Sequence, residues 1–289
     1  KLIYKFLILP ILQLINPEVS HFFAEKLLQV PFFRYFNPIG YFSKNKNITI
    51  NVMDIDFDTP IGLAAGYDKN CKTLGSLLSL GFGFITGGTI TLQERFGNPR
   101  PRLFHLPEKK SLINSLGFPS IGLKNVAKNL DSKSKIKNKL FLSVSGISED
   151  EIISCIKTLD IYTNIFEINI SSPNTSGLRL FHNPSELSKL IEKIKKSTHN
   201  RILIKLPPWS EDFKENHLNL AQTSILAGAD GLVIANSMPA NNPKLAVGKG
   251  GLSGKVLTKN TLRMIAEVRA SIGPNPIIVA CGGIFDEID

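Results

Sequence analysis

A group of polar side chains follows an apolar run in the middle of this chain of 289 residues. The run IFEINI (residues 165–170) has the composition of a buried β-strand, and SSPNTSG (residues 171–177) comes next. Asn169 and Asn174 carry amide groups that suit a flat ring with carbonyl and N–H edges. Ser172 has no histidine beside it, which argues against the nucleophile of a Ser-His-Asp hydrolase. It could take a weakly acidic C–H proton that leaves together with a hydride.

Two lysines also lie where strand-like runs end. Lys69 and Lys205 would point into the same rim of a parallel sheet, where a buried ammonium group needs an anionic partner. Few carboxylates are available there, because only Asp68 adjoins Lys69 and Glu167 lies within a strand. The pattern favours an anionic ligand over structural ion pairs, and both interpretations stay open.

Two glycine-rich loops suit a phosphate. GGLSG (residues 250–254) and CGGI (residues 281–284) let backbone N–H groups approach an anion closely. No GxGxxG motif follows the first strand, which disfavours a dinucleotide. A mononucleotide cofactor with one phosphate fits.

Short β-rich runs alternate with helical patterns from residue 48 onward. The predicted strands are 61–65, 82–86, 140–145, 165–170, 202–206, 231–235 and 276–281. The predicted helices are 70–80, 122–130, 149–159, 184–197, 214–227 and 258–271. Continuous apolar strands alternating with helices predict a parallel sheet buried on both faces.

A (β/α)₈ TIM barrel fits this alternation better than a doubly wound sheet. The polar residues follow the ends of all the strands, as at the carboxyl rim of a barrel, whereas a doubly wound sheet gathers them in one crevice. Seven strand–helix steps are visible, so we expect a barrel truncated before strand 8. A protein ending at Asp289 is then expected to be poorly soluble or free of cofactor.

The N-terminal residues are unusually apolar. LIYKFLILPILQLI (residues 2–15) is too short to span a bilayer and is interrupted by Pro10. Asn16, Pro17 and Glu18 then predict a helix start. Two short helices could form a monotopic membrane patch or a helical hairpin packed on its own domain, and the pattern favours neither.

Composition excludes several classes of protein. The net charge of +10 comes from lysines scattered over amphipathic segments, and no nucleic-acid-binding motif occurs. Cys71, Cys155 and Cys281 are too far apart to predict a disulfide framework. The five histidines show no metal-ligand spacing, so no metal site is predicted.

The motifs taken together resemble the flavin-dependent dihydroorotate dehydrogenases over nearly the whole chain. They are GLAAGYDKN, GFGFITGGTIT, GNPRPRLFHLPEKKSLINSLGF, INISSPNTSGLR, GGLSG and PIIVACGGI, in this order. The NPRPRLF…LINSLGF block and the apolar N-terminus resemble the membrane-associated, quinone-dependent class (class 2). The soluble class has a cysteine base where this chain has Ser172.

The resemblance implies FMN in the barrel mouth and dihydroorotate beside it. Ser172 would be the catalytic base that takes the C5 proton while C6 gives hydride to the flavin. The implied FMN contacts are Ala65, Gly66, Tyr67, Asp68, Lys69, Thr89, Ser143, Asn169, Lys205, Gly254 and Gly283. The implied substrate contacts are Lys69, Asn114, Ser115, Leu116, Gly117, Phe118, Asn169, Asn174, Asn236 and Ser237.

Two positions depart from the pattern of the resembled family. That family has an asparagine near the flavin after the third strand, and this chain has Ser143, a shorter side chain with one donor. A threonine of the sixth strand is replaced by Ala235. These changes put one flavin contact and one hydroxyl in question.

The expected activity is therefore oxidation of (S)-dihydroorotate to orotate, with a membrane quinone as final acceptor, in de novo pyrimidine biosynthesis. The alternatives are a flavin-dependent reductase of pyrimidines or of RNA uridines, and a non-catalytic membrane-surface protein. We expect residues 1–40 to be the membrane and quinone segment and residues 41–289 to be the FMN-binding barrel, with its C-terminal end missing. The expected location is peripheral, on the bacterial cytoplasmic membrane or the mitochondrial inner membrane.

Overall fold

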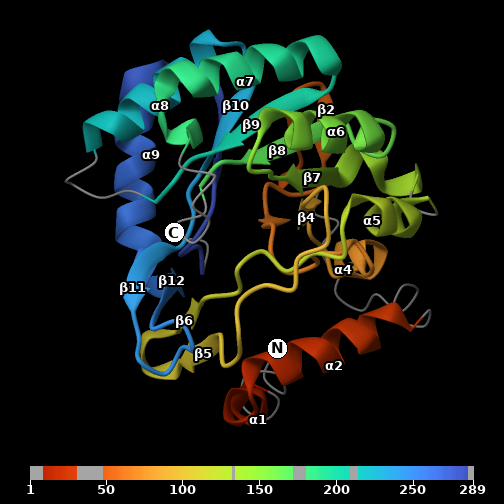
Figure 1. Ribbon diagram of the computed structural model, residues 1–289, viewed down its shortest axis with the longest axis vertical. Helices are drawn as coiled ribbons and strands as arrows, with labels where there is room; N and C mark the ends of the chain where they lie inside the picture. Colours follow the sequence, from red (N-terminus) through yellow and green to blue (C-terminus); the bar gives the residue numbers. More distant parts are fainter. Residues whose placement is uncertain (1–8, 31–47, 132–133, 172–179, 209–213, 286–289) are drawn as a thin grey trace.

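A curled parallel sheet forms the centre of the molecule (Figure 1). The computed structural model describes residues 9–30, 48–131, 134–171, 180–208 and 214–285. The sheet has seven strands in the order β13-β10-β9-β8-β7-β4-β3, so neighbours in the sheet are successive strands of the barrel. They are β3 (Gly62–Leu63), β4 (Phe84–Ile90), β7 (Leu140–Val144), β8 (Ile165–Asn169), β9 (Arg201–Lys205), β10 (Gly231–Ile234) and β13 (Ile277–Ala280). All pairings are parallel, which confirms the predicted strands and the barrel class.

Helices connect successive strands and cover the outer face of the sheet (Figure 1). They are α4 (Leu74–Ser79), α5 (Leu123–Leu130), α6 (Glu149–Leu159), α7 (Pro184–Ser197), α8 (Lys214–Leu226) and α9 (Thr258–Ile272), with short 3₁₀ helices at Pro107–Lys109, Ser134–Lys139 and Lys255–Leu257. Local chemistry sets where they begin. The Asn183 side chain accepts a hydrogen bond from the Ser185 N–H at 2.9 Å, and Pro184 occupies the first turn of α7.

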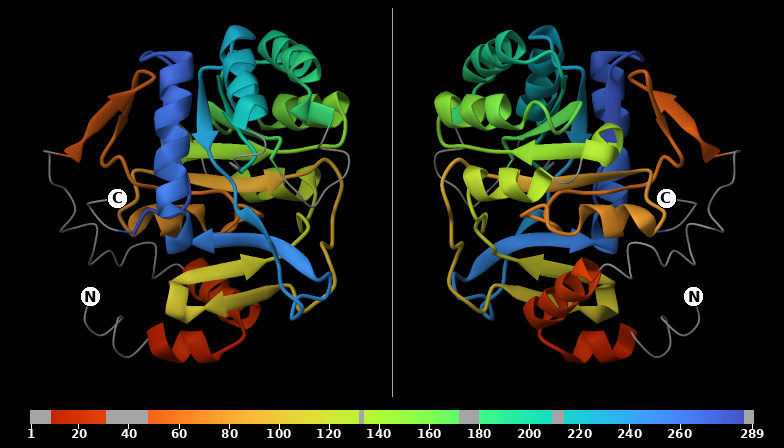
Figure 2. Two further views of the ribbon diagram at one scale, coloured as in Figure 1. Left: turned by 90° about the vertical axis from the view of Figure 1, so that its left-hand side faces the viewer. Right: turned by 90° about the vertical axis from the view of Figure 1, so that its right-hand side faces the viewer.

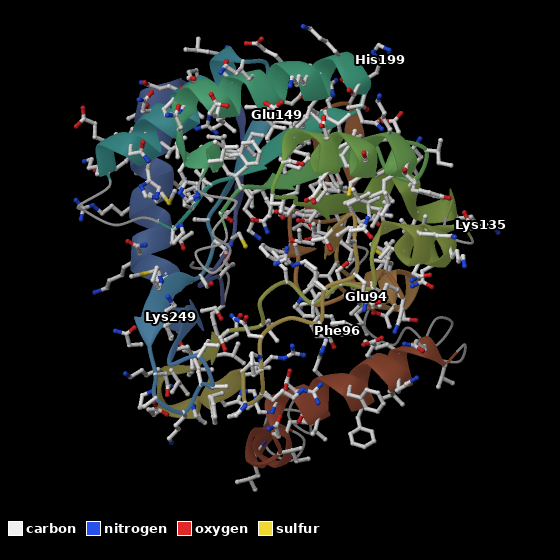
Figure 3. All side chains as sticks on the ribbon, in the orientation of Figure 1. Glu94, Phe96, Lys135, Glu149, His199 and Lys249 are labelled. Atoms are coloured by element: carbon white, nitrogen blue, oxygen red, sulfur yellow. The ribbon has the colours of Figure 1, made fainter. Side chains whose placement is uncertain are left out.

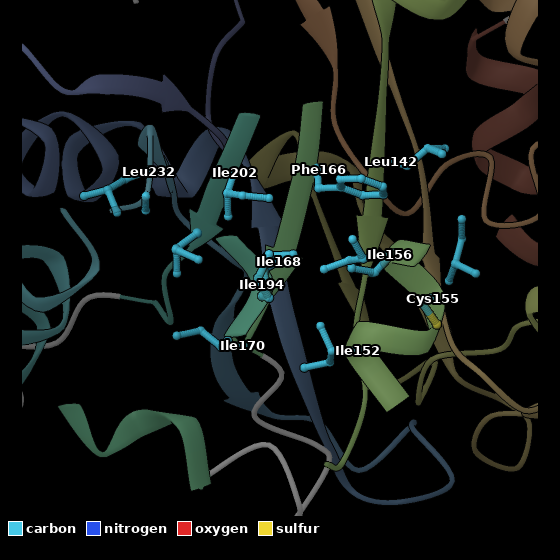
Figure 4. Close-up of a cluster of buried hydrophobic side chains, with 14 of the residues drawn as sticks. Leu142, Ile152, Cys155, Ile156, Phe166, Ile168, Ile170, Ile194, Ile202 and Leu232 are labelled. Carbon is cyan, nitrogen blue, oxygen red and sulfur yellow. The ribbon is translucent and has the colours of Figure 1, made fainter. Parts of the chain in front are cut away.

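The main hydrophobic core lies between the sheet and these helices (Figure 4). Side chains such as Leu142, Phe166 and Ile202 point outward from the strands and pack against Ile156 of α6 and Ile194 of α7. All of them are fully buried. Because side chains alternate along a strand, the intervening positions must face the inside of the barrel.

A second, smaller core closes the amino-terminal end of the barrel interior. Phe141, Ile165 and Leu203 point inward from the starts of β7, β8 and β9. Phe57 covers them from a hairpin of β1 (Ile50–Val52) and β2 (Ile55–Phe57), which was not predicted. Phe84 stacks on Phe141 with ring centroids 4.5 Å apart. The next inward positions toward the carboxyl ends are polar, and they carry the candidate site.

A small antiparallel sheet stands beyond the carboxyl ends of the barrel strands (Figure 2). It has the order β11-β12-β6-β5 and combines two insertions far apart in the sequence. Its strands are β5 (Leu103–Leu106), β6 (Ser111–Asn114), β11 (Met238–Asn241) and β12 (Lys249–Gly254). Sequence patterns missed this sheet, because its strands are short and because β11 and β12 contain proline or glycine, which are depleted in strands.

The N-terminal helices lie beside the antiparallel sheet (Figures 1 and 2). They are α1 (Leu9–Leu14) and α2 (Pro17–Gln29). As predicted, α2 begins at Asn16, whose side chain accepts a hydrogen bond from the Glu18 N–H at 2.9 Å. Among the residues that the structure describes, no helix has both the length and the apolar composition needed to cross a bilayer.

The surplus of basic residues is spread over the outside of the molecule. Lys135 and Lys249 are exposed, and Figure 3 shows them at widely separated points of the periphery. This distribution agrees with the interpretation of the net charge as solvated helix faces and loops.

Candidate active site

Six polar side chains at the carboxyl end of the barrel form one continuous chain of hydrogen bonds, which we call the donor chain. Its members are Asn236, Ser171, Asn169, Thr89, Ser143 and Glu167. The Asn236 side-chain amide donates to the Ser171 hydroxyl at 2.7 Å, and this hydroxyl donates to Oδ1 of the Asn169 side chain at 2.7 Å. These residues follow β10 and β8, so the chain joins the ends of two barrel strands.

The second half of the donor chain runs into the barrel. The Asn169 amide donates to the Thr89 hydroxyl at 2.9 Å, and Thr89 and Ser143 are 2.9 Å apart between their hydroxyl oxygens. The Ser143 hydroxyl donates to Glu167 Oε1 at 2.8 Å, which leaves Thr89 as the donor to Ser143. Every link is therefore polarised in the same direction and ends on a carboxylate.

Lys205 approaches Glu167 from the neighbouring strand. Its Nζ lies 3.6 Å from Glu167 Oε1, and the two residues are 4% and 3% exposed. Burial alone would lower the pKa of Lys205, but the charge of the neighbouring Glu167 carboxylate and its hydrogen bond outweigh burial and leave this pKa raised. The lysine thus remains an ammonium group. It forms an ion pair with Glu167, the interpretation that the sequence pattern had favoured less than an anionic ligand.

Strand register explains why these residues meet. Ser143 pairs with Glu167 across β7 and β8, and Asn169 pairs with Lys205 across β8 and β9. Glu167 and Asn169 are two residues apart and point to the same side of β8, directly above inward-facing Ile165. A polar layer therefore follows an apolar layer inside the barrel.

The loop after β3 holds a second lysine near the same rim. Lys69 Nζ donates to the Gly66 carbonyl, and the Gly66 N–H donates to the Gly88 carbonyl of β4 at 2.8 Å. Burial, followed by the positive charge of Arg102, lowers the pKa of Lys69 to about 8. An anion beside Lys69 would stabilise the charged ammonium group against both burial and the repulsion by Arg102.

Asp68 has a structural task in this loop. One carboxylate oxygen accepts the Lys72 N–H at 2.9 Å, and the other accepts the Thr73 N–H at 2.7 Å and the Thr73 hydroxyl at 3.0 Å. These bonds satisfy backbone donors where α4 begins. The Asp68 side chain is therefore fully engaged within its own loop.

The predicted substrate residues border the rim from the antiparallel sheet. Asn114 ends β6, and its amide donates to the Gly251 carbonyl at 3.3 Å. Ser115 is fully buried, and its hydroxyl has no hydrogen-bond partner among the described residues. Gly117 needs a positive φ of 71°, and a Cβ there would meet the Asn98 side chain at 2.8 Å. The backbone of this segment is thus packed tightly against Asn98, whose N–H donates to the Leu116 carbonyl at 3.0 Å.

Glycines form a cradle at the N-terminus of α9. Gly254 has φ +105°, and a Cβ there would meet the Lys110 carbonyl at 2.6 Å. Gly283 has φ +79°, and a Cβ there would meet the Thr258 nitrogen at 2.4 Å. Thr258 is the first residue of α9, so the first backbone N–H groups of a helix face this loop. Glycine at both positions thus allows the two loops to pack closely against the chain that leads into α9.

The barrel therefore brings together most of the predicted site residues, on β4, β7, β8, β9 and the loops after β3, β6, β10 and β13. Ser172 and Asn174 lie outside the described residues, so their predicted roles stay predictions. Glu167 was the residue that sequence reasoning did not assign. Its signal is a charged residue in an otherwise apolar strand, spaced two residues from Asn169.

The inner face of α2 contacts the Lys69 loop and the antiparallel sheet. Glu18, His21 and Glu25 recur at helical spacing and bond to Arg102, Tyr67 and Lys72, respectively. His21 Nε2 lies 3.0 Å from the Tyr67 carbonyl oxygen, and the two rings meet edge to face. Phe22, Phe23 and Leu27 point away from the barrel and are 53%, 65% and 52% exposed. One face of α2 thus packs on the protein, as in the predicted hairpin, and the opposite face is apolar and exposed, as in the predicted membrane patch.

Comparison with known proteins identifies the family of this fold and site. The model of the family described as dihydroorotate dehydrogenase matches residues 47–289. The chain belongs to the dihydroorotate dehydrogenase family. The matched region contains the three sheets of the described residues and the whole donor chain, and α1 and α2 precede it.

Relatives within the dihydroorotate dehydrogenase family cover most of the chain. A protein of Sulfurimonas denitrificans named dihydroorotate dehydrogenase (quinone) is 34% identical over 93% of this chain and 80% of its own length. One of Nocardioides with the same name is 30% identical over 93% of this chain and 82% of its own. A crystal structure of DHODH from Eimeria tenella in complex with ferulenol superposes with a TM-score of 0.81 at 26% identity, covering 93% of this chain and 81% of that one.

Proposed function

We propose that the chain oxidises dihydroorotate to orotate with FMN as the bound hydride acceptor and a quinone as the final electron acceptor, in pyrimidine biosynthesis. The observation that carries this proposal is the buried Lys205 ammonium at the end of the donor chain, at the carboxyl rim of a barrel of this family. The names of the relatives support the quinone as acceptor.

The FMN site would extend across the rim from the donor chain to the glycine cradle. When bound, FMN supplies a ring that accepts a hydride and passes on two electrons. Thr89, Asn169 and Lys205 would bind the ring, and Lys205 would stabilise negative charge on its reduced form. Gly254, Gly283 and the N-terminus of α9 would hold the phosphate. Ala65 to Lys69 would contact the ring from the β3 loop. Ser143 would lie in the layer below the ring, where it accepts a hydrogen bond from Thr89.

The substrate would lie between the donor chain and the segment from Asn114 to Phe118. Lys69 would bind its carboxylate, with Asn114, Asn174, Asn236 and Ser237 on the polar edges of the pyrimidine. Ser172 would remove the C5 proton as the C6 hydride departs, so the substrate loses one proton and one hydride to become orotate. The roles of Ser172 and Asn174 are part of this proposal, because both residues lie outside the part of the chain that the structure describes.

Residues 1–40 would form the quinone entrance and the membrane contact. The exposed apolar face of α2 suits the interface of a bilayer, while Glu18 and His21 hold the opposite face against the protein. This arrangement supports a peripheral membrane protein, with the quinone entering beside α2.

A direct assay tests the proposed reaction. Purified protein should show the visible absorbance of FMN and should form orotate from dihydroorotate when a ubiquinone analogue is supplied. NAD⁺ or fumarate in place of the quinone should give little turnover. Reduction of uracil or uridine by NADPH, without orotate formation from dihydroorotate, would instead establish the pyrimidine reductase alternative.

A further inference from the structure

Glu167 is a buried carboxylate that none of the proposed binding or catalytic steps uses. It is 3% exposed, in the middle of β8, with hydrophobic Phe166 and Ile168 on either side in the sequence. A buried carboxylate costs several kcal/mol unless it is paired and hydrogen-bonded, so its presence here needs a reason. Its ion pair is with Lys205, the residue proposed to face the flavin.

The surroundings of Glu167 fix its position. Oε1 accepts the Ser143 hydroxyl at 2.8 Å and lies 3.6 Å from Lys205 Nζ. The Cys281 thiol approaches the same pair from the end of β13, and burial together with the charge of Glu167 keeps its pKa raised against the pull of Lys205. The thiol therefore stays neutral, and the net charge of the group formed by Glu167, Lys205 and Cys281 is close to zero.

The layers of the barrel place Glu167 on the far side of Lys205 from the rim. Glu167 precedes Asn169 by two residues on the same face of β8, one layer nearer the apolar plug of Phe141 and Ile165. The end of the donor chain therefore lies directly beneath the proposed ring site. A charge at this depth is poorly screened by solvent.

We propose that Glu167 is a positioning residue that tunes the bound flavin: its carboxylate fixes the Lys205 ammonium and offsets its charge, so that the ring site meets a neutral ion pair instead of a bare cation. This inference rests on the proposed binding of FMN. A bare cation would stabilise the negatively charged reduced flavin strongly, whereas the ion pair stabilises it less. The flavin would then release its electrons to a quinone more readily.

The midpoint potential of the bound flavin tests this role, because a purely structural residue would leave it unchanged. Glu167→Gln keeps the shape and the acceptor for Ser143 but removes the charge. Measured with redox dyes at pH 6.5, the potential should rise by about 30 mV, which is a tenfold change in the relative affinity for reduced and oxidised flavin. Glu167→Asp, which keeps the charge, is the matched control and should shift the potential by less than half as much. An unchanged potential in the glutamine variant, or an equal shift in both variants, overturns the proposal.

A measurement on the unmodified holoenzyme covers the case in which the variants fail to fold. Redox-induced infrared difference spectra report carboxylate protonation directly. If Glu167 is the counter-ion of Lys205 in both flavin states, reduction should produce no band of a buried carboxylic acid, and the appearance of such a band contradicts the proposal. If dihydroorotate reduces the flavin but substitution of Glu167 leaves the midpoint potential unchanged, this inference alone is refuted. If the protein binds no FMN, the proposed function is refuted.

Discussion

The Nε atom of Arg102 lies 2.6 Å from Oε1 of Glu18, and this contact holds α2 against the start of β5 in the antiparallel sheet. The two side chains are 11% and 16% exposed, so the ion pair is largely withdrawn from solvent. Arg102 also donates to the carbonyls of Phe96 and Asn98, which places its guanidinium group in a rigid frame. The proposed quinone entrance is bounded by this same contact.

Glu18→Gln should therefore impair the quinone half of the reaction selectively. Loss of the carboxylate leaves Arg102 without its charged partner, at a cost of about 1.5–3 kcal/mol for a hydrogen bond to a charged group. We expect a higher KM for the quinone and an unchanged rate of flavin reduction by dihydroorotate, measured by steady-state and stopped-flow kinetics. Glu25→Gln is the matched control, because its pair with Lys72 is more exposed and should contribute little. Equal effects of the two substitutions would contradict this account.

A variant lacking residues 1–36 should separate membrane binding from flavin chemistry. The exposed Phe22, Phe23 and Leu27 are removed with it, and so is the contact between Glu18 and Arg102. The variant should no longer sediment with lipid vesicles and should lose turnover with long-chain quinones. Dihydroorotate should still reduce its flavin. Unchanged kinetics with a long-chain quinone would move the quinone site elsewhere.

Ser172→Ala should slow flavin reduction without releasing the cofactor. A side chain acting as a general base contributes a factor of about 10²–10⁴, and alanine offers no group to replace it. Raising the pH should not restore the rate. Stopped-flow reduction of the flavin by dihydroorotate measures the effect directly, and a nearly unchanged rate would exclude Ser172 as the base.

Lys69 should make both binding and stability depend on pH. Its pKa is lowered to about 8, first by burial and then by Arg102, from an ordinary value of 10.5. Between these two values the unfolded chain binds more protons than the folded protein, so the free energy of unfolding of the cofactor-free protein should rise with pH. Binding of the anionic substrate should weaken above about pH 8, because the ammonium group is lost.

Urea unfolding between pH 7 and 10 and substrate titrations over the same range check this prediction. The Lys69→Met variant should be more stable than the parent at pH 7, and its free energy of unfolding should not rise with pH in this way. Lys72→Met, which replaces a more exposed lysine of the same loop, is the control and should keep the parental pH profile. A parental profile in the Lys69→Met variant would show that another group is responsible.

The barrel could be predicted from the sequence because its strands and helices have clear local sequence patterns. Runs such as LFLSV and IFEIN are continuously apolar on the outward positions, and α6 and α7 begin at capping residues Ser148 and Asn183. The antiparallel sheet was not readable. Its strands β6 and β12 are separated by more than a hundred residues and pair through backbone bonds, to which glycine-rich sequences give no local signal.

Only part of the site could be predicted from the sequence, because some of its contacts depend on strand register and not on local patterns. The residues at strand ends follow from the barrel rule, so Thr89, Asn169 and Lys205 were expected to meet. Glu167 lies one layer deeper, where the same rule expects apolar side chains. Its partnership with Lys205 depends on the register of β8 and β9, which composition does not determine. The direction of the donor chain likewise needs the positions of the individual hydroxyl groups.

An anaerobic titration of the purified protein with dihydroorotate tests the central claim most directly. Bound FMN should bleach with one equivalent of dihydroorotate per flavin and yield one equivalent of orotate, and addition of a ubiquinone analogue should restore the colour. Flavin that stays oxidised in excess dihydroorotate, or a protein that binds no flavin, would contradict the proposed function.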